Sequence, residues 1–278
     1  MNLKDYKLVW SDEFDYEGRP DENKWTYEVG NFQWPNKELQ AYSDRLTNVF
    51  VKDGRLTIQS NKEQDGEREY TSGKINTKGK AHWKYGFFEV RAKFPKGAGS
   101  WPAIWLMPYK EPRPIPEGIP VRSDGRPDFE RFTEKDWEVF PKPPVEDRWP
   151  NCGEIDLVEH IGRRPDACLF SLHSGKHNHQ RKDTIPYTTL KEFDEAFFDE
   201  YHNYQMEWTE DYFEFFIDDV SYCKYSKSDD DGSYDAWPFD KEFFLIINTA
   251  VGGGLGGPVD DSMFPYLFEI EYVRVYQK

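Results

Sequence analysis

Three carboxylates stand close together in the segment Gly153-Glu154-Ile155-Asp156-Leu157-Val158-Glu159-His160. On a regular strand the side chains alternate between two faces, so Glu154 and Asp156 share a face while Glu159 points to the other. A one-residue bulge near Leu157–Val158, two adjacent apolar residues, would shift the alternation by one position and turn Glu159 to the face of Glu154 and Asp156. We therefore expect all three carboxylates on one side of a bulged strand.

This crowding predicts a particular chemistry. Close like charges raise the pKa of at least one carboxyl, as a general acid requires. With the bulge, four rises of ~3.3 Å put the backbones of Glu154 and Glu159 ~13 Å apart, and side chains leaning inward can approach the ~5–5.5 Å of a retaining glycosidase. Asp156 between them can share a proton with either glutamate. An acidic, solvent-facing strand fits the spacing equally well.

Aromatic residues around this segment favour the chemical interpretation. Trp149 precedes the strand, and Trp101 and Trp105 lie in a segment that follows Gly97 and Gly99. The aromatic content of 17%, with ten tryptophans, is high. Flat aromatic faces pack against the apolar faces of sugar rings, so these residues are typical of a cleft that binds carbohydrate.

The elements that must position the carboxylates are predicted to be strands. Short segments rich in β-branched and aromatic residues recur, separated by Gly, Pro, Asn and Asp. The expected strands include Leu56–Ser60, Gly86–Phe94, Glu154–Glu159, Tyr204–Trp208, Tyr212–Ile217, Phe243–Asn248 and Phe268–Tyr276. Asp53-Gly54 predicts a tight hairpin turn, and only Leu190–Tyr201 looks helical. The fold class is therefore all-β, a two-sheet antiparallel sandwich or jelly roll.

One stretch does not read as strand. Eight prolines occur from Pro112 to Pro144, among charges of both signs. Because proline cannot donate to a ladder, this predicts an irregular insertion at about 109–148 within a single domain spanning 1–278. A loop of that length is usually functional or disordered, so the insertion either walls the cleft or is a solvated excursion.

Composition restricts the partners. The net charge of −16 argues against nucleic acid and anionic membranes, and it weakens the case for a sulfated substrate. Cys152, Cys168 and Cys223 have no metal-ligand spacing and are expected to be buried free thiols in a monomer. The first residues lack a signal-peptide pattern, so the protein either stays in the cell or has lost a leader.

The segment Glu154–Glu159 resembles the bulged signature of glycoside hydrolase family 16, in its laminarinase-like branch. The resemblance runs nearly end to end. The other matching segments, in family order, are Leu8–Phe14, Asn36–Gln40, Tyr70–Ile75, Tyr85–Lys93, Trp101–Trp105, Trp237–Phe239, Asn248–Gly253 and Tyr272–Tyr276. It implies a β-jelly roll with a concave cleft, and a retaining endo-glycosidase that hydrolyses β-1,3- or mixed β-1,3-1,4-glucans.

The resemblance also implies residue roles. Glu154 matches the nucleophile, Glu159 the acid/base and Asp156 the assisting carboxylate, with His173 near the acid/base. The substrate-binding residues it implies are Trp101, Trp105, Asn36, Lys74, Trp149, His173 and Asn248; for Trp105 a core position, and for His173 a structural role, stays open. Departures from the family pattern include Lys74 and Phe87, each in place of a frequent arginine, and they leave the substrate open.

No cofactor is expected for catalysis. Many members of the family hold a structural calcium, and the matching positions here are Glu13, Gly54 and Glu271; an unoccupied turn is the alternative. Three other functions stay open: hydrolysis of a galactan such as agar, porphyran or carrageenan, transglycosylation with the same residues, and glucan binding without activity. Inactive relatives typically lose the catalytic glutamates, which are both present here.

Overall fold

The computed structural model describes residues 4–111, 114–122, 125–140, 142–194 and 196–278, and Pro112 and Pro141 of the insertion lie outside this part. One sheet contains β2 (Thr26–Tyr27), β7 (Lys74–Asn76), β9 (Ser100–Pro108), β10 (Glu154–His160), β11 (Ala167–His173), β12 (Tyr187–Glu192) and β16 (Phe243–Val251). The other contains β1 (Lys7–Asp12), β4 (Val49–Lys52), β5 (Arg55–Ser60), β8 (Gly86–Lys93), β13 (His202–Trp208), β14 (Tyr212–Ile217), β15 (Val220–Ser226) and β17 (Tyr266–Gln277).

Smaller elements complete the fold. β3 (Gln40–Tyr42) and β6 (Tyr70–Ser72) form a parallel pair that the sequence did not predict. The short α-helices are α1 (Glu134–Val139) and α2 (Gly253–Gly256), and the 3₁₀ turns are Pro35–Lys37, Phe129–Arg131, Val145–Asp147, Phe197–Asp199, Lys227–Asp229 and Asp261–Met263.

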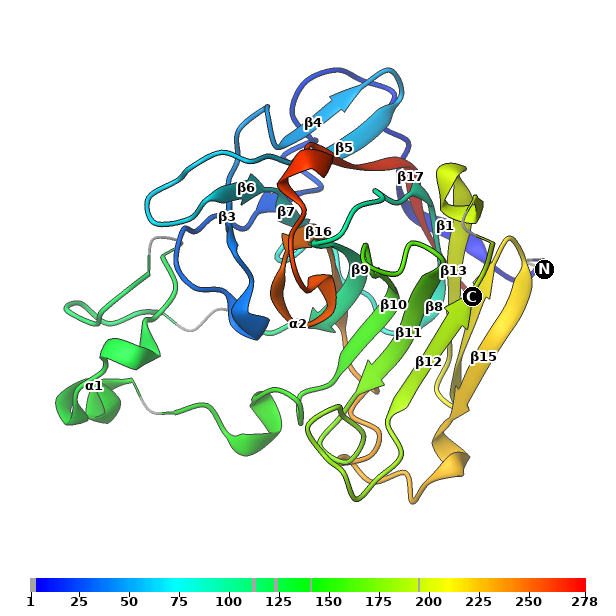
Figure 1. Ribbon diagram of the computed structural model, residues 1–278. Coiled ribbons are helices and arrows are strands. Elements are labelled where there is room, and N and C mark those ends of the chain that lie inside the picture. The colour runs from blue at the N-terminus through cyan, green and yellow to red at the C-terminus, as the bar shows by residue number, and fades with distance from the viewer. Residues whose placement is uncertain (1–3, 112–113, 123–124, 141, 195) are drawn as a thin grey trace.

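The two large antiparallel sheets enclose an apolar core, as the predicted sandwich requires (Figure 1). The order of the seven-stranded sheet is β12-β11-β10-β9-β16-β7-β2. The order of the eight-stranded sheet is β15-β14-β13-β8-β17-β5-β4, with β1 also paired to β17. This arrangement, with strands distant in sequence lying side by side, is the jelly roll expected from the sequence.

Alternation of side chains along the strands builds this core. In β8, Phe88, Val90 and Ala92 are buried in the core, while the charged residues between them are only half-buried. Between β4 and β5, Asp53 and Gly54 have φ values of 53° and 73°, the left-handed conformations of a tight hairpin turn. The predicted strands and the predicted turn are confirmed.

The prediction of a helix over Leu190–Tyr201 was wrong. β12 continues to Glu192, and Leu190 lies opposite Leu169 of β11. Among the residues of this range that the structure describes, only Phe197–Asp199 is helical, as a single 3₁₀ turn. An isolated short helix is costly to nucleate, and pairing with the edge of a sheet satisfies the backbone better.

The insertion is less irregular than predicted. Thr133 and Asp136 cap α1 reciprocally, each side chain accepting from the other residue's backbone N–H. Its aromatic residues pack on one another: Phe129, Phe132, Trp137 and Phe140. Figure 1 draws α1 at the left of the view, away from the two large sheets. The insertion therefore carries a small apolar cluster of its own.

The prediction of buried free thiols is confirmed for Cys152 and Cys168 but not for Cys223, which is half-buried. All three are free thiols. Among the described residues, no helix is both long enough and apolar enough to cross a membrane.

The predicted bulge is present in β10. Asp156 lies opposite Ser171 of β11, whereas Glu159 lies opposite Leu169, so three steps along β10 match two along β11. Leu157 and Val158, although adjacent, are both fully buried in the core. The extra residue thus turns Glu159 to the face that Glu154 and Asp156 occupy.

This packing can be tested by truncating each of the two adjacent residues. Because both face the core, Leu157→Ala should lower the free energy of unfolding by about 2–5 kcal/mol, and Val158→Ala by ~1.5 kcal/mol or more. Leu190→Ala is the control, since Leu190 is 41% exposed on β12 and should cost less than ~0.5 kcal/mol. Urea unfolding measures all three. On a regular strand one residue of the pair would face outward, so a near-neutral result for either would contradict the bulge.

Candidate active site

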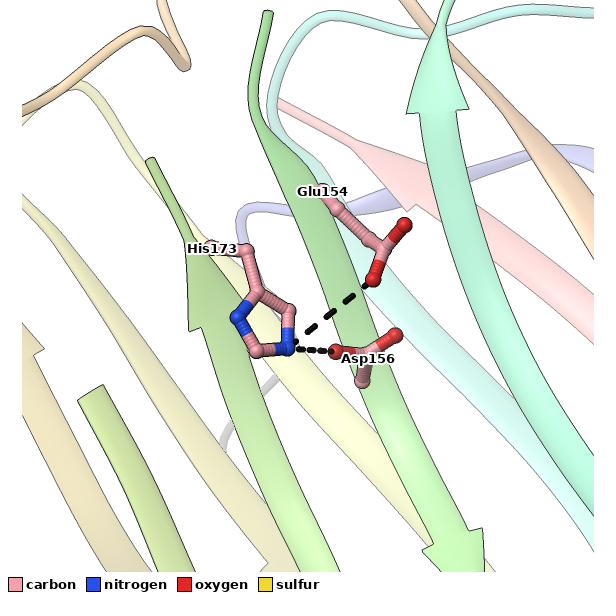
Figure 2. A group of neighbouring side chains, drawn as sticks. All are labelled: Glu154, Asp156 and His173. Carbon is pink, nitrogen blue, oxygen red and sulfur yellow. Dashed lines mark ion pairs between the residues drawn. The ribbon is translucent and has the colours of Figure 1, made fainter. Parts of the chain in front are cut away.

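The carboxylates lie on the outer face of the seven-stranded sheet, the face turned away from the core. Glu154 and Asp156 project from β10, and His173 projects toward them from β11, where it is the strand partner of Glu154 (Figure 2). Nε2 of His173 is 3.3 Å from Oδ2 of Asp156 and 3.9 Å from Oε1 of Glu154. His173 was predicted near Glu159; the ion-pair contacts that the structure gives it are with the other two carboxylates.

Burial dominates the electrostatics of this group. Burial raises the pKa of Glu154, and repulsion from Asp156 and Glu159 adds to it, while His173 and Lys74 oppose it. Burial and Asp156 likewise raise the pKa of Glu159, against a hydrogen bond from Trp101. The pKa of Asp156 is raised by burial alone. The site therefore favours partial protonation near neutral pH, as the crowding in the sequence predicted.

Asp156 is the least solvated member of the group. Its side chain is 5% exposed, and in the described part of the chain no hydrogen-bond donor satisfies Oδ2. A buried carboxylate oxygen without a hydrogen-bond donor is costly, whereas the protonated carboxyl can itself donate. Asp156 is thus suited to hold a proton and to hydrogen-bond a neighbouring glutamate.

Two tryptophans of β9 contact the site in different ways. Trp101 donates a hydrogen bond from Nε1 to Oε1 of Glu159, over 2.9 Å. Trp105 lies opposite Asp156 on the neighbouring strand and donates to Oδ1 of Asn248, over 2.7 Å. Both rings are half-buried on the outer face. Trp105 is therefore not part of the core, which the sequence had left open.

The hydrogen bonds continue across the sheet beyond Trp105. Nδ2 of Asn248 donates to the hydroxyl of Tyr42 over 2.9 Å, and that hydroxyl donates to Oε2 of Glu38 over 3.2 Å. Nε2 of Gln40 donates to the same oxygen over 2.8 Å. Such a chain fixes the amide orientation of Asn248 and so the donors and acceptors offered to a ligand.

Lys74 lies in an aromatic surrounding further along the same face. Its Nζ is 5.0 Å from the ring centroid of Trp34, 5.1 Å from that of Trp105 and 5.8 Å from that of Tyr42. Its ion pair is with Oε2 of Glu28, over 3.0 Å. The ammonium group is thus held by protein groups, which limits its freedom to reach a ligand.

Asn36 and Trp149 lie at two margins of the site. Asn36 is exposed, and a Cβ on Gly253 would lie 3.1 Å from its carbonyl oxygen and 3.3 Å from the ring of Trp101. Glycine is therefore needed for this close approach. Trp149 is half-buried, with its ring centroid 5.9 Å from that of His173 and 5.3 Å from that of His179.

The residues expected to hold calcium are engaged otherwise. Both carboxylate oxygens of Glu13 bind Arg274, at 3.1 and 2.8 Å, and Oε2 of Glu271 is 2.6 Å from Nε of Arg91. Calcium takes six to eight oxygen ligands, and Gly54 offers a single carbonyl. This donor set does not fit calcium.

Several residues of the site were not predicted from the sequence. Glu28, Trp34 and Tyr42 lie outside the segments that resemble the family. Glu38 lies inside one of them, Asn36–Gln40, but no function was predicted for it. The alternation of apolar and polar residues could not find them, because they lie in loops and in the small β3–β6 pair. Only the three-dimensional arrangement brings them to Lys74 and Asn248.

Two family models match the chain in succession. Residues 1–111 match the model described as beta-glucan synthesis-associated protein SKN1/KRE6/Sbg1, and residues 143–263 match the model of glycosyl hydrolases family 16. The segment between the two matches, residues 112–142, is most of the proline-rich insertion. Neither match includes this segment.

Similar proteins cover the chain almost completely. A beta-glucanase of Rhodothermus marinus is 38% identical over 98% of this chain and 85% of its own length. The crystal structure of SCLam, a non-specific endo-β-1,3(4)-glucanase with a glucan oligosaccharide at its active site, is 35% identical, covers 99% of this chain and 95% of that chain, and gives a TM-score of 0.80. A keratan-sulfate endo-1,4-beta-galactosidase of Sphingobacterium multivorum is 31% identical over 98% of this chain and 56% of its own length.

The raised pKa of Glu159 makes stability depend on pH. Burial raises this pKa from 4.5 to about 8, so folding favours the protonated form. The stability that this contributes is complete below pH ~4.5 and is lost as the pH rises through about 8. Glu159→Gln removes the titration. Its melting temperature should match the native protein at pH 4.5 and exceed it by about 2–4 °C at pH 8, for a difference of ~1 kcal/mol or more.

Differential scanning calorimetry at several pH values measures this gain. Glu210→Gln, at an exposed position on the loop between β13 and β14, controls for the general effect of removing a negative charge. A gain for Glu159→Gln that does not grow with pH, or that the control reproduces, would contradict the proposed burial of charge.

Proposed function

We propose a function from one premise, that this chain belongs to glycosyl hydrolases family 16. As a single catalytic domain, it is proposed to be a retaining endo-β-glucanase that hydrolyses β-1,3- or mixed β-1,3-1,4-glucans. One observation carries the proposal: the bulge in β10 aligns Glu154, Asp156 and Glu159 on one face, where Asp156 is buried, the two glutamates are half-buried and Trp101 donates to Glu159. The similarity to glucanases over nearly the whole chain supports the substrate class.

The first step of the proposed reaction forms a covalent intermediate. Glu159, protonated, gives its proton to the glycosidic oxygen as the bond to the anomeric carbon breaks. Ionised Glu154 attacks that carbon from the opposite side and forms a glycosyl ester. Burial raises the pKa of both glutamates to about 8, and His173 lowers both. The order of the two roles therefore follows the match to the family's signature, and Lys74, which lowers the pKa of Glu154, is compatible with it.

The second step returns the site to its starting state. Glu159, now a carboxylate, takes a proton from water, and the oxygen of that water attacks the anomeric carbon. The ester bond to Glu154 breaks, and the sugar leaves with the anomeric configuration of the substrate after two inversions. Asp156 holds a proton next to Glu154 and stabilises its changing charge through a hydrogen bond. A sugar hydroxyl in place of water would give transglycosylation with the same groups.

Galactan hydrolysis is the second candidate, because one relative of this chain is named for cleavage of keratan sulfate. The net charge of −16 opposes binding of a sulfated chain. We expect release of reducing sugar from laminarin or mixed-linkage β-glucan, and little from agarose, porphyran, carrageenan or keratan sulfate. Release from a galactan with none from either glucan would replace the glucanase proposal by the galactanase one.

The two glutamates can be distinguished by azide rescue. Glu154→Ala should lose hydrolysis entirely, because no other group can form the ester intermediate. Glu159→Ala should lose about 10²–10⁴-fold on a natural glucan, and much less on an aryl glycoside with a good leaving group. With azide, the Glu159 variant should yield a β-glycosyl azide and the Glu154 variant an α-glycosyl azide. Product anomers identified by NMR in the reverse pattern would exchange the two roles.

A further inference from the structure

On the outer face of the seven-stranded sheet, a row of side chains runs from the carboxylates of β10 through Trp105, Asn248 and Lys74. This row ends at the β2 edge of the sheet. Asn248 of β16 lies opposite Lys74 of β7, and the N–H of Glu28, directly after β2, donates to the carbonyl of Lys74 over 2.9 Å. β2 is the last strand in this direction. A glucan lying across the strands from the carboxylates would therefore pass Lys74 and then reach Glu28.

Next to this edge lies an aromatic pair that a glucan could have stacked on. The rings of Phe32 and Trp34 are 4.4 Å apart between centroids, and Trp34 is also 5.0 Å from Tyr42. Its Nε1 donates to the carbonyl of Gly30 over 3.2 Å. Trp34 is nevertheless only 3% exposed, so other groups already cover its ring.

Arginines of the insertion cover these two rings. Cζ of Arg126 lies 5.4 Å from the ring centroid of Trp34, and Cζ of Arg122 lies 5.0 Å from that of Phe32. Both residues belong to one ribbon, closed by the bridge between Val121 and Pro127 and by a hydrogen bond of 2.8 Å from the N–H of Arg122 to the carbonyl of Arg126.

An ion pair fixes this ribbon to the end of the row. Nη1 of Arg126 is 2.6 Å from Oε1 of Glu28, while Oε2 of the same carboxylate binds Lys74. Glu28 thus joins the insertion to a residue on the proposed substrate face. Because the Arg126 side chain is 47% exposed, this pair contributes modestly to stability, and its loss should leave the fold intact.

We propose that Arg126 and Arg122 close the β2 edge of the substrate site and limit how many sugar units bind beyond Lys74. A planar guanidinium over an aromatic ring occupies the surface on which a sugar ring would stack. The enzyme then gains little binding free energy from sugar units that extend past this edge. This inference rests on the proposed glucanase function and assigns the insertion a role in chain-length specificity.

The test compares kcat and KM on a ladder of β-1,3-gluco-oligosaccharides of increasing length. For the native protein, kcat/KM should rise with the number of glucose units only for short oligosaccharides and then level off. In Arg122→Ala/Arg126→Ala, with the rings uncovered, kcat/KM for the longest substrates should rise about three- to tenfold through KM, as one new stacking contact allows. The shortest substrates should be unaffected, and longer products should appear from laminarin.

Two further variants keep the test decisive. Arg131→Ala, an exposed arginine of the same insertion, should leave the length profile unchanged. Arg126→Lys keeps the charge facing Glu28 but lacks the planar group, so it should show part of the rise in kcat/KM for the longest substrates. If the double alanine variant does not fold, Arg126→Lys and the single variant Arg122→Ala provide the test.

The outcomes separate this inference from the function on which it rests. If the native protein cleaves glucans and the folded variants keep its length profile, the closure by the arginines is wrong and the glucanase proposal stands. A fall in kcat/KM for long substrates would also overturn the inference, because the arginines would then be binding the glucan. If the native protein cleaves no glucan, the glucanase proposal fails and this inference falls with it.

Discussion

A single extra residue in β10 is the constraint on which the site depends. Without it, the strict alternation of a strand would place Glu159 among core side chains and Val158 on the outer face. With it, Ile155, Leu157 and Val158 all enter the core, and the three carboxylates share the other side. The same residue therefore satisfies apolar packing between the sheets and brings together groups that repel one another.

That repulsion is balanced by a shell of fixed neighbours. Trp101 donates to Glu159, His173 faces Asp156 and Glu154, and Lys74 lowers the pKa of Glu154 from further along the face. These groups are carried by strands of one sheet, so their positions are set by the backbone rather than by loops. Burial strengthens the electrostatic interactions between these groups and lowers the free energy of unfolding. Such a balance is typical of sites arranged for acid–base chemistry.

The sequence predicted those parts of the molecule that follow local rules. Alternation along β8, the turn at Asp53-Gly54 and the bulge at Leu157–Val158 each depend on a few adjacent residues, and the structure confirms them. Leu190–Tyr201 was predicted as helix because its edge-strand pairing depends on β11, which lies earlier in the chain. Contacts between distant loops could not be predicted from the sequence for the same reason. Glu28 joins Arg126 to Lys74 across nearly a hundred residues, and no local pattern marks such a link.

The central claim is that Glu154 and Glu159, on one bulged strand, act by double displacement. Proton NMR of the first product formed from a β-glucan oligosaccharide tests it most directly, because the anomeric signal appears before mutarotation. Two inversions predict that the new reducing end is initially the β-anomer, with the α-anomer following only at the rate of mutarotation. An initial α-anomer would show a single inversion. That result would mean that water attacks directly, and that Glu154 is a base rather than a nucleophile.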